Sequence, residues 1–251
     1  MTKRVIILAA LTAMTYGCKE KEKTEKEAGD MTSMTATSPE NQDSEWKTLF
    51  DGETLEGWHA YNGDTLSDQW KVEDGAVVLT PAENRDGSQN LISDDEYTDF
   101  ILSIDSKISE GGNSGILWAV QEMDKYNEPY YTGPEIQVLD NERHPDAKVN
   151  GKLHQAGALY DMVAPGQDVA NPAGEWNTTV LKIDHKNNEG SVTLNGTEIV
   201  KFPVEGAEWD AMVAKSKFAD WVDFGKAKTG HIALQDHGNQ VSFKNIKIKE
   251  L

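Results

Sequence analysis

The chain has 251 residues, one cysteine and a formal net charge of −19 at neutral pH. A protein this acidic lacks the cationic surface that nucleic-acid binding requires, and a single cysteine excludes an intrachain disulfide. With 37% hydrophobic and 27% charged residues, the composition is that of a globular protein and excludes a collagen-like chain or a polytopic membrane protein.

Residues 1–17 predict a signal peptide of the bacterial lipoprotein type. Lys3 and Arg4 give it a basic start, and residues 5–14 form an apolar run that is too short to span a bilayer. We expect cleavage before Cys18 and lipidation of this cysteine, because several acyl chains anchor a protein stably in a membrane. The expected product is an outer-membrane lipoprotein that faces the periplasm or the cell surface. An ordinary secretory signal, cleaved nearby, is the alternative.

Residues 18–45 are poor in apolar side chains and show no periodicity, which is typical of a solvated tether. From residue 46 onward, alternating apolar and polar residues predict short β-strands, and we expect one folded domain over 46–251. Asp74-Gly75 and Asn195-Gly196 predict two tight hairpin turns. In chain order, the predicted strands are 46–50, 70–72, 76–79, 99–109, 114–120, 134–140, 178–185, 191–196, 197–202, 230–236 and 241–251.

One stretch, 209–221, roughly follows helical spacing and predicts a short helical insertion between strands. The many short strands with Gly, Asn and Asp turns favour an all-β fold, an antiparallel β-sandwich. Alternation places Ile136 and Val138 on one face of their strand and Glu135 and Gln137 on the other. The apolar faces need a core, whereas the polar faces either meet water or line a cleft.

Several kinds of chemistry lack their motifs in this sequence. There is no Gly-rich phosphate loop and no dinucleotide fingerprint, so we expect no NAD. The G-x-S-x-G motif of nucleophile-elbow hydrolases is absent, and Cys18 is assigned to lipidation. Retaining glucanases of the sandwich type need two carboxylates about 5 Å apart, and no strand carries the alternating acidic pattern that would supply them.

Four polar clusters with aromatic residues nearby remain as candidate sites. They are residues 111–115 before Trp118, then Glu135 with Gln137 and Asp140, then 154–160, and finally 235–238. Each cluster also has a structural interpretation. The glycines can form a simple turn, Glu135 can be a solvated strand residue, and a single histidine is more often structural than catalytic.

Taken in order, eight stretches that span nearly all of 46–251 resemble one family, the 3-keto-disaccharide hydrolase or 3-keto-glycoside hydrolase/lyase domain. The resemblance implies a concanavalin A-like jelly-roll sandwich. It also implies an enzyme that cleaves glycosides already oxidised at C3 by a sugar 3-dehydrogenase acting upstream. The stretches are LFDGETLEGW (49–58), W-x-VEDG (70–75), GGNSGILW (111–118), PEIQVLD (134–140), GALYDMVAP (157–165), GEWNTTVLKI (174–183), LNGTEIV (194–200) and GHIALQDHGNQVSFKNIKIKEL (230–251).

In the implied reaction a ketone at C3 acidifies the hydrogen on C2. A base removes this proton, the enolate expels the glycosidic oxygen from C1, and water can add back. The base must work near neutral pH, as histidine does, and the enolate needs a divalent metal or hydrogen-bond donors. We predict His154 as base or metal ligand with Glu135 as its partner, since carboxylate and imidazole together suit a divalent transition metal. We expect sugar contacts from Asn113, Gln137, Tyr160, Gln235 and His237.

Three other functions fit the same sequence, because a fold does not fix a function. A non-catalytic, lectin-like lipoprotein would bind unoxidised glycans without turnover. A conventional glycoside hydrolase would cleave unmodified sugars. A structural surface lipoprotein would have no ligand at all, and mutations in its polar clusters would be silent.

Overall fold

The computed structural model describes residues 45–251 with the exception of 64 and 86. The predicted signal peptide, Cys18 and nearly all of the tether lie outside the described residues, so their roles stay predictions. The described part forms two antiparallel β-sheets, one α-helix and two 3₁₀ helices, which confirms the predicted all-β jelly-roll sandwich with a short helical insertion. None of these helices is both long and apolar enough to cross a lipid bilayer.

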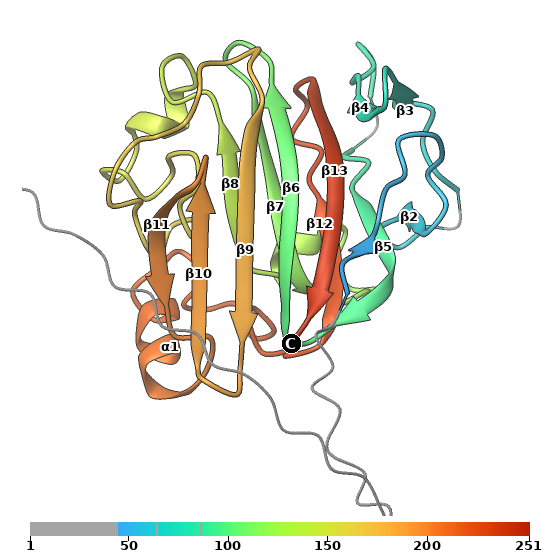
Figure 1. Ribbon diagram of the computed structural model, residues 1–251. Helices are drawn as coiled ribbons and strands as arrows, with labels where there is room; N and C mark the ends of the chain where they lie inside the picture. The colour runs from blue at the N-terminus through green and yellow to red at the C-terminus, as the bar shows by residue number, and fades with distance from the viewer. Residues whose placement is uncertain (1–44, 64, 86) are drawn as a thin grey trace, which may run out of the picture. The chain divides into compact units, whose positions relative to one another are not determined.

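The larger sheet has eight strands and forms the front of the view in Figure 1. Its order is β11-β10-β9-β6-β13-β4-β3, and β1 pairs with the C-terminal part of β13. The strands are β1 (Lys47–Thr48), β3 (Trp70–Glu73), β4 (Ala76–Leu79), β6 (Phe100–Ile108), β9 (Asn177–Asp184), β10 (Glu189–Leu194), β11 (Thr197–Phe202) and β13 (Val241–Glu250).

The smaller sheet lies behind it, in the order β2-β5-β12-β7-β8. Beyond β8, residues 157–160 continue the hydrogen bonding. The Gly157 amide donates to the Gln137 carbonyl at 2.8 Å, and the Tyr160 amide donates to the Glu135 carbonyl at 3.0 Å. The strands are β2 (Trp58–Ala60), β5 (Leu91–Tyr97), β7 (Asn113–Val120), β8 (Glu135–Leu139) and β12 (Gly230–Leu234).

One apolar core fills the space between the two sheets. In β6, Phe100, Leu102 and Ile104 are fully buried and alternate with partly exposed neighbours. Ile116 of β7 and Ile136 of β8 belong to the same core from the opposite sheet. Because burial of each such side chain contributes about 2 kcal/mol, the alternation determines which face of each strand points inward.

The outer face of the smaller sheet is only partly apolar. Ile92, Leu117, Val120 and Ala233 form a small separate cluster there, and Tyr130 packs against it. The loop that carries the 3₁₀ helix η1 (Pro129–Tyr131) therefore covers part of this face. Beside the cluster, the same face of β7 and β8 carries the polar side chains of the candidate site.

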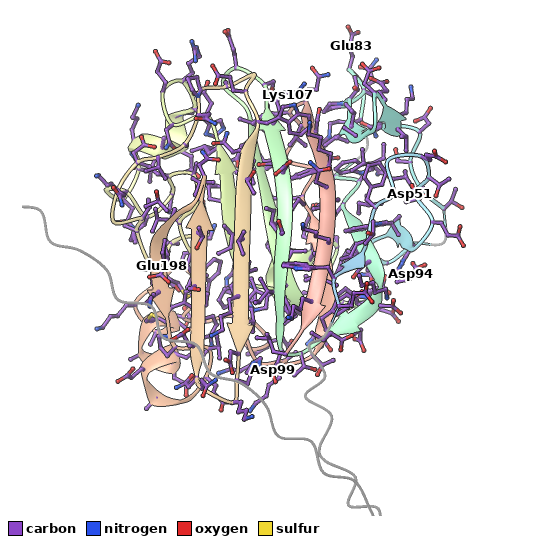
Figure 2. The ribbon with its side chains drawn as sticks, viewed as in Figure 1. Asp51, Glu83, Asp94, Asp99, Lys107 and Glu198 are labelled. Atoms are coloured by element: carbon purple, nitrogen blue, oxygen red, sulfur yellow. The ribbon has the colours of Figure 1, made fainter. Side chains whose placement is uncertain are left out.

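Exposed carboxylates surround the domain. Figure 2 shows Asp51, Glu83 and Asp94 along one edge and Glu198 towards the opposite edge, and all four residues are exposed. The negative net charge is thus spread over the surface, an arrangement that favours solubility.

The sequence did not predict β2 and β5. The first three residues of β5 are buried and the next three are exposed acidic residues, so its alternation is too short to recognise. Its strand conformation comes from pairing with β2 and β12 on its two sides. Both predicted hairpin turns are present, with Asp74 at φ 51° and Asn195 at φ 50°, each followed by a glycine of positive φ.

The predicted helix over 209–221 needs correction, because α1 spans Gly206–Val213. After the helix, the Ser216 hydroxyl donates to the Val213 carbonyl at 2.8 Å. The Lys217 amide donates to the Asp161 carboxylate at 2.6 Å instead of extending the helix. This tertiary contact overrides the local helical pattern. Residues 214–225, called the 214–225 loop below, therefore form turns that reach the candidate site.

Candidate active site

Glu135 occupies a gap that a glycine of the neighbouring strand leaves open. β8 pairs with β7 so that Gln137 lies opposite Gly115 and Glu135 lies opposite Leu117. The Glu135 side chain lies directly over Gly115, so that a Cβ atom on Gly115 would collide with the Glu135 Oε1 atom. Any larger residue at 115 would therefore displace the Glu135 carboxylate from this position.

Two glutamine amides flank the Glu135 carboxylate. Oriented to satisfy its neighbours, the Gln137 Nε2 group donates to Glu135 Oε1 at 3.2 Å and to Asn113 Oδ1 at 3.1 Å. On the other side, Gln235 Nε2 lies 3.5 Å from Glu135 Oε2. The Gln235 Oε1 atom is buried without a partner, so it is an acceptor that a ligand hydroxyl can satisfy.

Burial raises the pKa of Glu135 to about 7, because the protein removes the water that would solvate its charged form. The positive charge of Lys217 and the Gln235 hydrogen bond act in the opposite direction, and the Asp146 carboxylate adds to the rise. The Glu135 residue is only 8% exposed. A carboxyl group with this pKa is partly deprotonated at neutral pH and suits proton abstraction from a weak carbon acid.

His154 lies behind this site, held between two carboxylates. Its Nδ1 atom is 2.8 Å from Asp146 Oδ1, and its Nε2 atom is 2.8 Å from Asp161 Oδ1. Its ring stacks on Tyr160 with 4.3 Å between the ring centroids. Both ring nitrogens of His154 thus contact carboxylates, and its predicted role as base or metal ligand stays a prediction.

The two carboxylates extend this support to the site. The Tyr160 hydroxyl donates to Asp146 Oδ2 at 3.1 Å, and the Lys217 amide donates to Asp161 Oδ2. Burial, and then the nearby carboxylates of Asp146 and Glu135, raise the pKa of Tyr160. The Tyr160 hydroxyl therefore stays protonated at neutral pH and keeps its hydrogen bond to Asp146.

The side chains around Glu135 enclose a cavity of about 290 Å³. All five residues predicted to contact sugar line this cavity together with Glu135, whereas His154 does not. Strands β7 and β8, the end of β12, η1 and the 214–225 loop thus supply one site. The lining residues are Asn113, Tyr130, Tyr131, Glu135, Gln137, Tyr160, Lys217, Phe218, Trp221, Gln235 and His237.

An aromatic wall from two loops completes the cavity. Tyr131 lies 5.0 Å from Tyr130 and 4.9 Å from Trp221, measured between ring centroids. The Tyr126 hydroxyl donates to Asp223 at 2.7 Å, which ties the two loops together. Sequence reasoning missed this wall. The aromatic residues gathered in YNEPYY (126–131) and KFADW (217–221) were the available signal.

His237 stands at the rim of the cavity. Loss of water around its ring and the nearby His144 lower the pKa of His237, although part of the residue remains exposed. Its ring centroid lies 6.1 Å from that of His144. A neutral imidazole both donates and accepts hydrogen bonds, so His237 suits contact with sugar hydroxyls.

Glu135 and His154, the predicted pair of metal ligands, have other polar partners in this structure. Both His154 nitrogens bond to carboxylates, and the Glu135 oxygens face amide groups. Among the described residues, no three His, Cys, Asp or Glu side chains are arranged to hold a metal ion. A divalent metal therefore stays a prediction without a ligand set in this part of the chain.

Known proteins resemble the chain over most of its length. A family model described as "3-keto-alpha-glucoside-1,2-lyase-like domain" matches residues 45–249. A Bacteroides thetaiotaomicron protein named 3-keto-disaccharide hydrolase is 34% identical in an alignment of length 230, which covers 81% of this chain and 78% of that protein. The crystal structure of a candidate glycosyl hydrolase from Parabacteroides distasonis aligns with a TM-score of 0.75 and 33% identity, over 82% of this chain and 94% of the other. A second crystal structure of a candidate glycosyl hydrolase from the same organism aligns with a TM-score of 0.62 and 25% identity, over 82% of this chain and 100% of the other.

Fold, cavity and relatives together define a β-sandwich enzyme that cleaves glycosides. More closely, the chain belongs to the 3-keto-alpha-glucoside-1,2-lyase-like domain family, because the family model covers nearly all of its described residues. This membership confirms the resemblance that the sequence motifs indicate.

Gly115→Ala is expected to reduce glycoside cleavage by about 100-fold while the domain still folds, because the new Cβ displaces the Glu135 carboxylate and misplaces it for reaction. Steady-state kinetics and circular dichroism measure both effects. The matched control is Gly166→Ala, whose Cβ would meet only an ordinary 3.5 Å contact. Equal activities of the two variants would contradict the assigned role of Gly115.

Glu135→Gln is expected to stabilise the fold at pH 8 by on the order of 2 kcal/mol. The folded-state pKa of about 7 lies above the ordinary value of 4.5. The protonated Glu135 carboxyl group therefore stabilises the wild-type fold fully below about pH 4.5, and this stabilisation is lost as the pH rises through 7. Urea unfolding of both proteins at pH 5 and pH 8 measures the difference, which should be small at pH 5. If Glu135→Gln gained less stability over the wild type at pH 8 than at pH 5, burial could not be the cause of the raised pKa.

Proposed function

We propose that this enzyme cleaves the glycosidic bond of glycosides oxidised at C3, by removal of the C2 proton followed by β-elimination. The observation that carries the proposal is the buried Glu135 carboxylate, whose pKa is raised to about 7 in the wall of a sugar-sized cavity. The name of the B. thetaiotaomicron relative, 3-keto-disaccharide hydrolase, supports the same substrate class.

In the proposed reaction, the Glu135 carboxylate takes the proton from C2. The electrons of the C2–H bond form a C2=C3 double bond, and the C3 carbonyl electrons move onto oxygen. When the carbonyl re-forms, the electrons shift to C1=C2 and the C1–O bond breaks. The departing oxygen takes a proton from solvent and Glu135 returns its proton to solvent, so the first products are an unsaturated keto sugar and a free alcohol. Addition of water across C1=C2 then gives net hydrolysis.

Glu135 is the better base because its oxygens reach the cavity, whereas both nitrogens of His154 are bonded to carboxylates. We assign His154 a positioning role through Asp146 and Asp161. The surrounding polar groups would hold the sugar. These are Asn113, Gln137, Tyr160, Gln235 and His237. His237 can donate a hydrogen bond to a substrate oxygen, and the Tyr160 oxygen, whose hydrogen goes to Asp146, can accept one from a substrate hydroxyl.

The proposed cellular setting rests on the sequence and on electron balance. A lipid anchor on Cys18 would hold the enzyme at the outer membrane, facing the periplasm or the cell surface. The elimination neither gains nor loses electrons, so a separate sugar 3-dehydrogenase must supply the oxidised glycoside.

The full-length protein is expected to release the alcohol from a 3-keto-glucoside and not from the unoxidised parent glucoside. Mass spectrometry of the sugar product distinguishes an elimination product from its hydrate, and a parallel reaction with EDTA tests the metal prediction. Cleavage of the unoxidised glucoside would favour a conventional glycosidase. Binding of glycans without cleavage of either compound would favour a lectin.

Glu135→Gln is expected to reduce kcat at least about 100-fold, because it removes the base. His154→Gln should cost less and should keep the acid limb of the wild-type profile of kcat/KM, which falls as the pH drops below about 7 and Glu135 becomes protonated. Stopped assays at acidic to mildly basic pH provide the profiles of kcat/KM against pH for the wild type and for His154→Gln. Loss of the acid limb in His154→Gln, with activity retained in Glu135→Gln, would reverse the two assignments.

A further inference from the structure

Lys217 brings a positive charge into the cavity. Of the described residues that line it, Lys217 alone is a lysine or arginine. Its Nζ atom lies 4.1 Å from the centroid of the Tyr160 ring and 5.2 Å from that of Phe218. No motif in the sequence pointed to this residue, because the predicted helix hid the loop that carries it.

The backbone of Lys217 is fixed by the same network that holds His154. Asp161 accepts from the Lys217 amide through Oδ2 and contacts His154 Nε2 through Oδ1. The Tyr160 ring, under the Lys217 ammonium, is stacked on His154. The network therefore holds both the start of the Lys217 side chain and the ring on which its end rests.

The Lys217 ammonium group is available to a ligand. Within the described part of the chain it forms no ion pair with a carboxylate, in contrast to Lys125, Lys182 and Lys226. Part of the residue is exposed to solvent, yet loss of water around the ammonium lowers the pKa of Lys217, while the carboxylates of Glu135, Asp161 and Asp146 act to raise it. Its charge thus interacts with Glu135 across the cavity without being neutralised by a direct contact.

Proton removal from C2 leaves a negative charge on the C3 oxygen, close to the buried carboxyl group that has taken the proton. Such charge is stabilised best by a preorganised cation or hydrogen-bond donor. We propose that Lys217 is a catalytic residue whose ammonium group donates a hydrogen bond to the C3 oxygen of the substrate and stabilises the enolate. This inference rests on the proposed function. In this arrangement Glu135 takes the C2 proton, and Lys217 binds the C3 oxygen, which receives the electrons of the broken C2–H bond.

The direct test is exchange of the C2 hydrogen, which reports enolate formation without bond cleavage. A 3-keto-1,5-anhydroglucitol has no glycosidic leaving group, so the full-length enzyme in D₂O should exchange its C2 hydrogen for deuterium. Lys217→Met is expected to slow this exchange by about 100-fold or more. The matched control is Lys215→Met, which removes a nearby exposed lysine outside the cavity lining and should exchange like the wild type.

Chemical rescue separates a catalytic loss from a folding defect. In a Cys18→Ser chain, Lys217→Cys provides the one thiol in the protein, and 2-bromoethylamine converts it to a close lysine analogue. Recovery of exchange after this treatment is the expected result. Wild-type exchange rates in Lys217→Met, or no recovery in a folded, fully alkylated protein, would overturn the inference.

Two further outcomes are distinguishable. Borohydride treatment that joins the sugar to Lys217 would show an imine with the C3 ketone and would overturn the hydrogen-bonding role. A wild-type enzyme that neither exchanges the C2 hydrogen nor cleaves a 3-keto-glucoside would contradict the proposed function itself, and the role of Lys217 would fall with it. Wild-type exchange that is insensitive to Lys217→Met would contradict only the inference.

Discussion

The site depends on the placement of a carboxylate against a glycine in a region largely removed from water. The Glu135 carboxylate occupies its position because Gly115 of β7 has no side chain, and the two glutamine amides beside it do not neutralise its charge. Desolvation therefore holds the pKa of Glu135 near 7. The same burial that costs folding stability at high pH would prepare Glu135 as the base of the proposed reaction at neutral pH.

The second constraint is the network behind the cavity. His154 joins Asp146 and Asp161, and through them it fixes the Tyr160 hydroxyl and the Lys217 backbone. We therefore propose that His154 acts through these residues, without contact with the substrate. The β-sandwich supplies the rigid wall with Glu135, and the two loops supply the aromatic and cationic groups opposite.

Much of this arrangement could be predicted from the sequence. Alternation in 134–140 placed Glu135 and Gln137 on one face, and the structure confirms that both line the cavity. The role of His154 could not be read from the sequence, because the carboxylates at 146 and 161 reach it only in the folded chain. Lys217 was missed for a similar reason, since a tertiary hydrogen bond to Asp161 ends the helical pattern before it.

The proposed reaction requires a Glu135 carboxyl group that titrates near neutral pH. Carbon-13 NMR of the protein labelled at glutamate side-chain carboxyls measures this titration directly, and the signal absent from Glu135→Gln identifies the residue. The account predicts a midpoint of about 7. A midpoint close to the ordinary value of 4.5 would contradict it, because the carboxylate would then be solvated and too weak a base for the proposed proton abstraction.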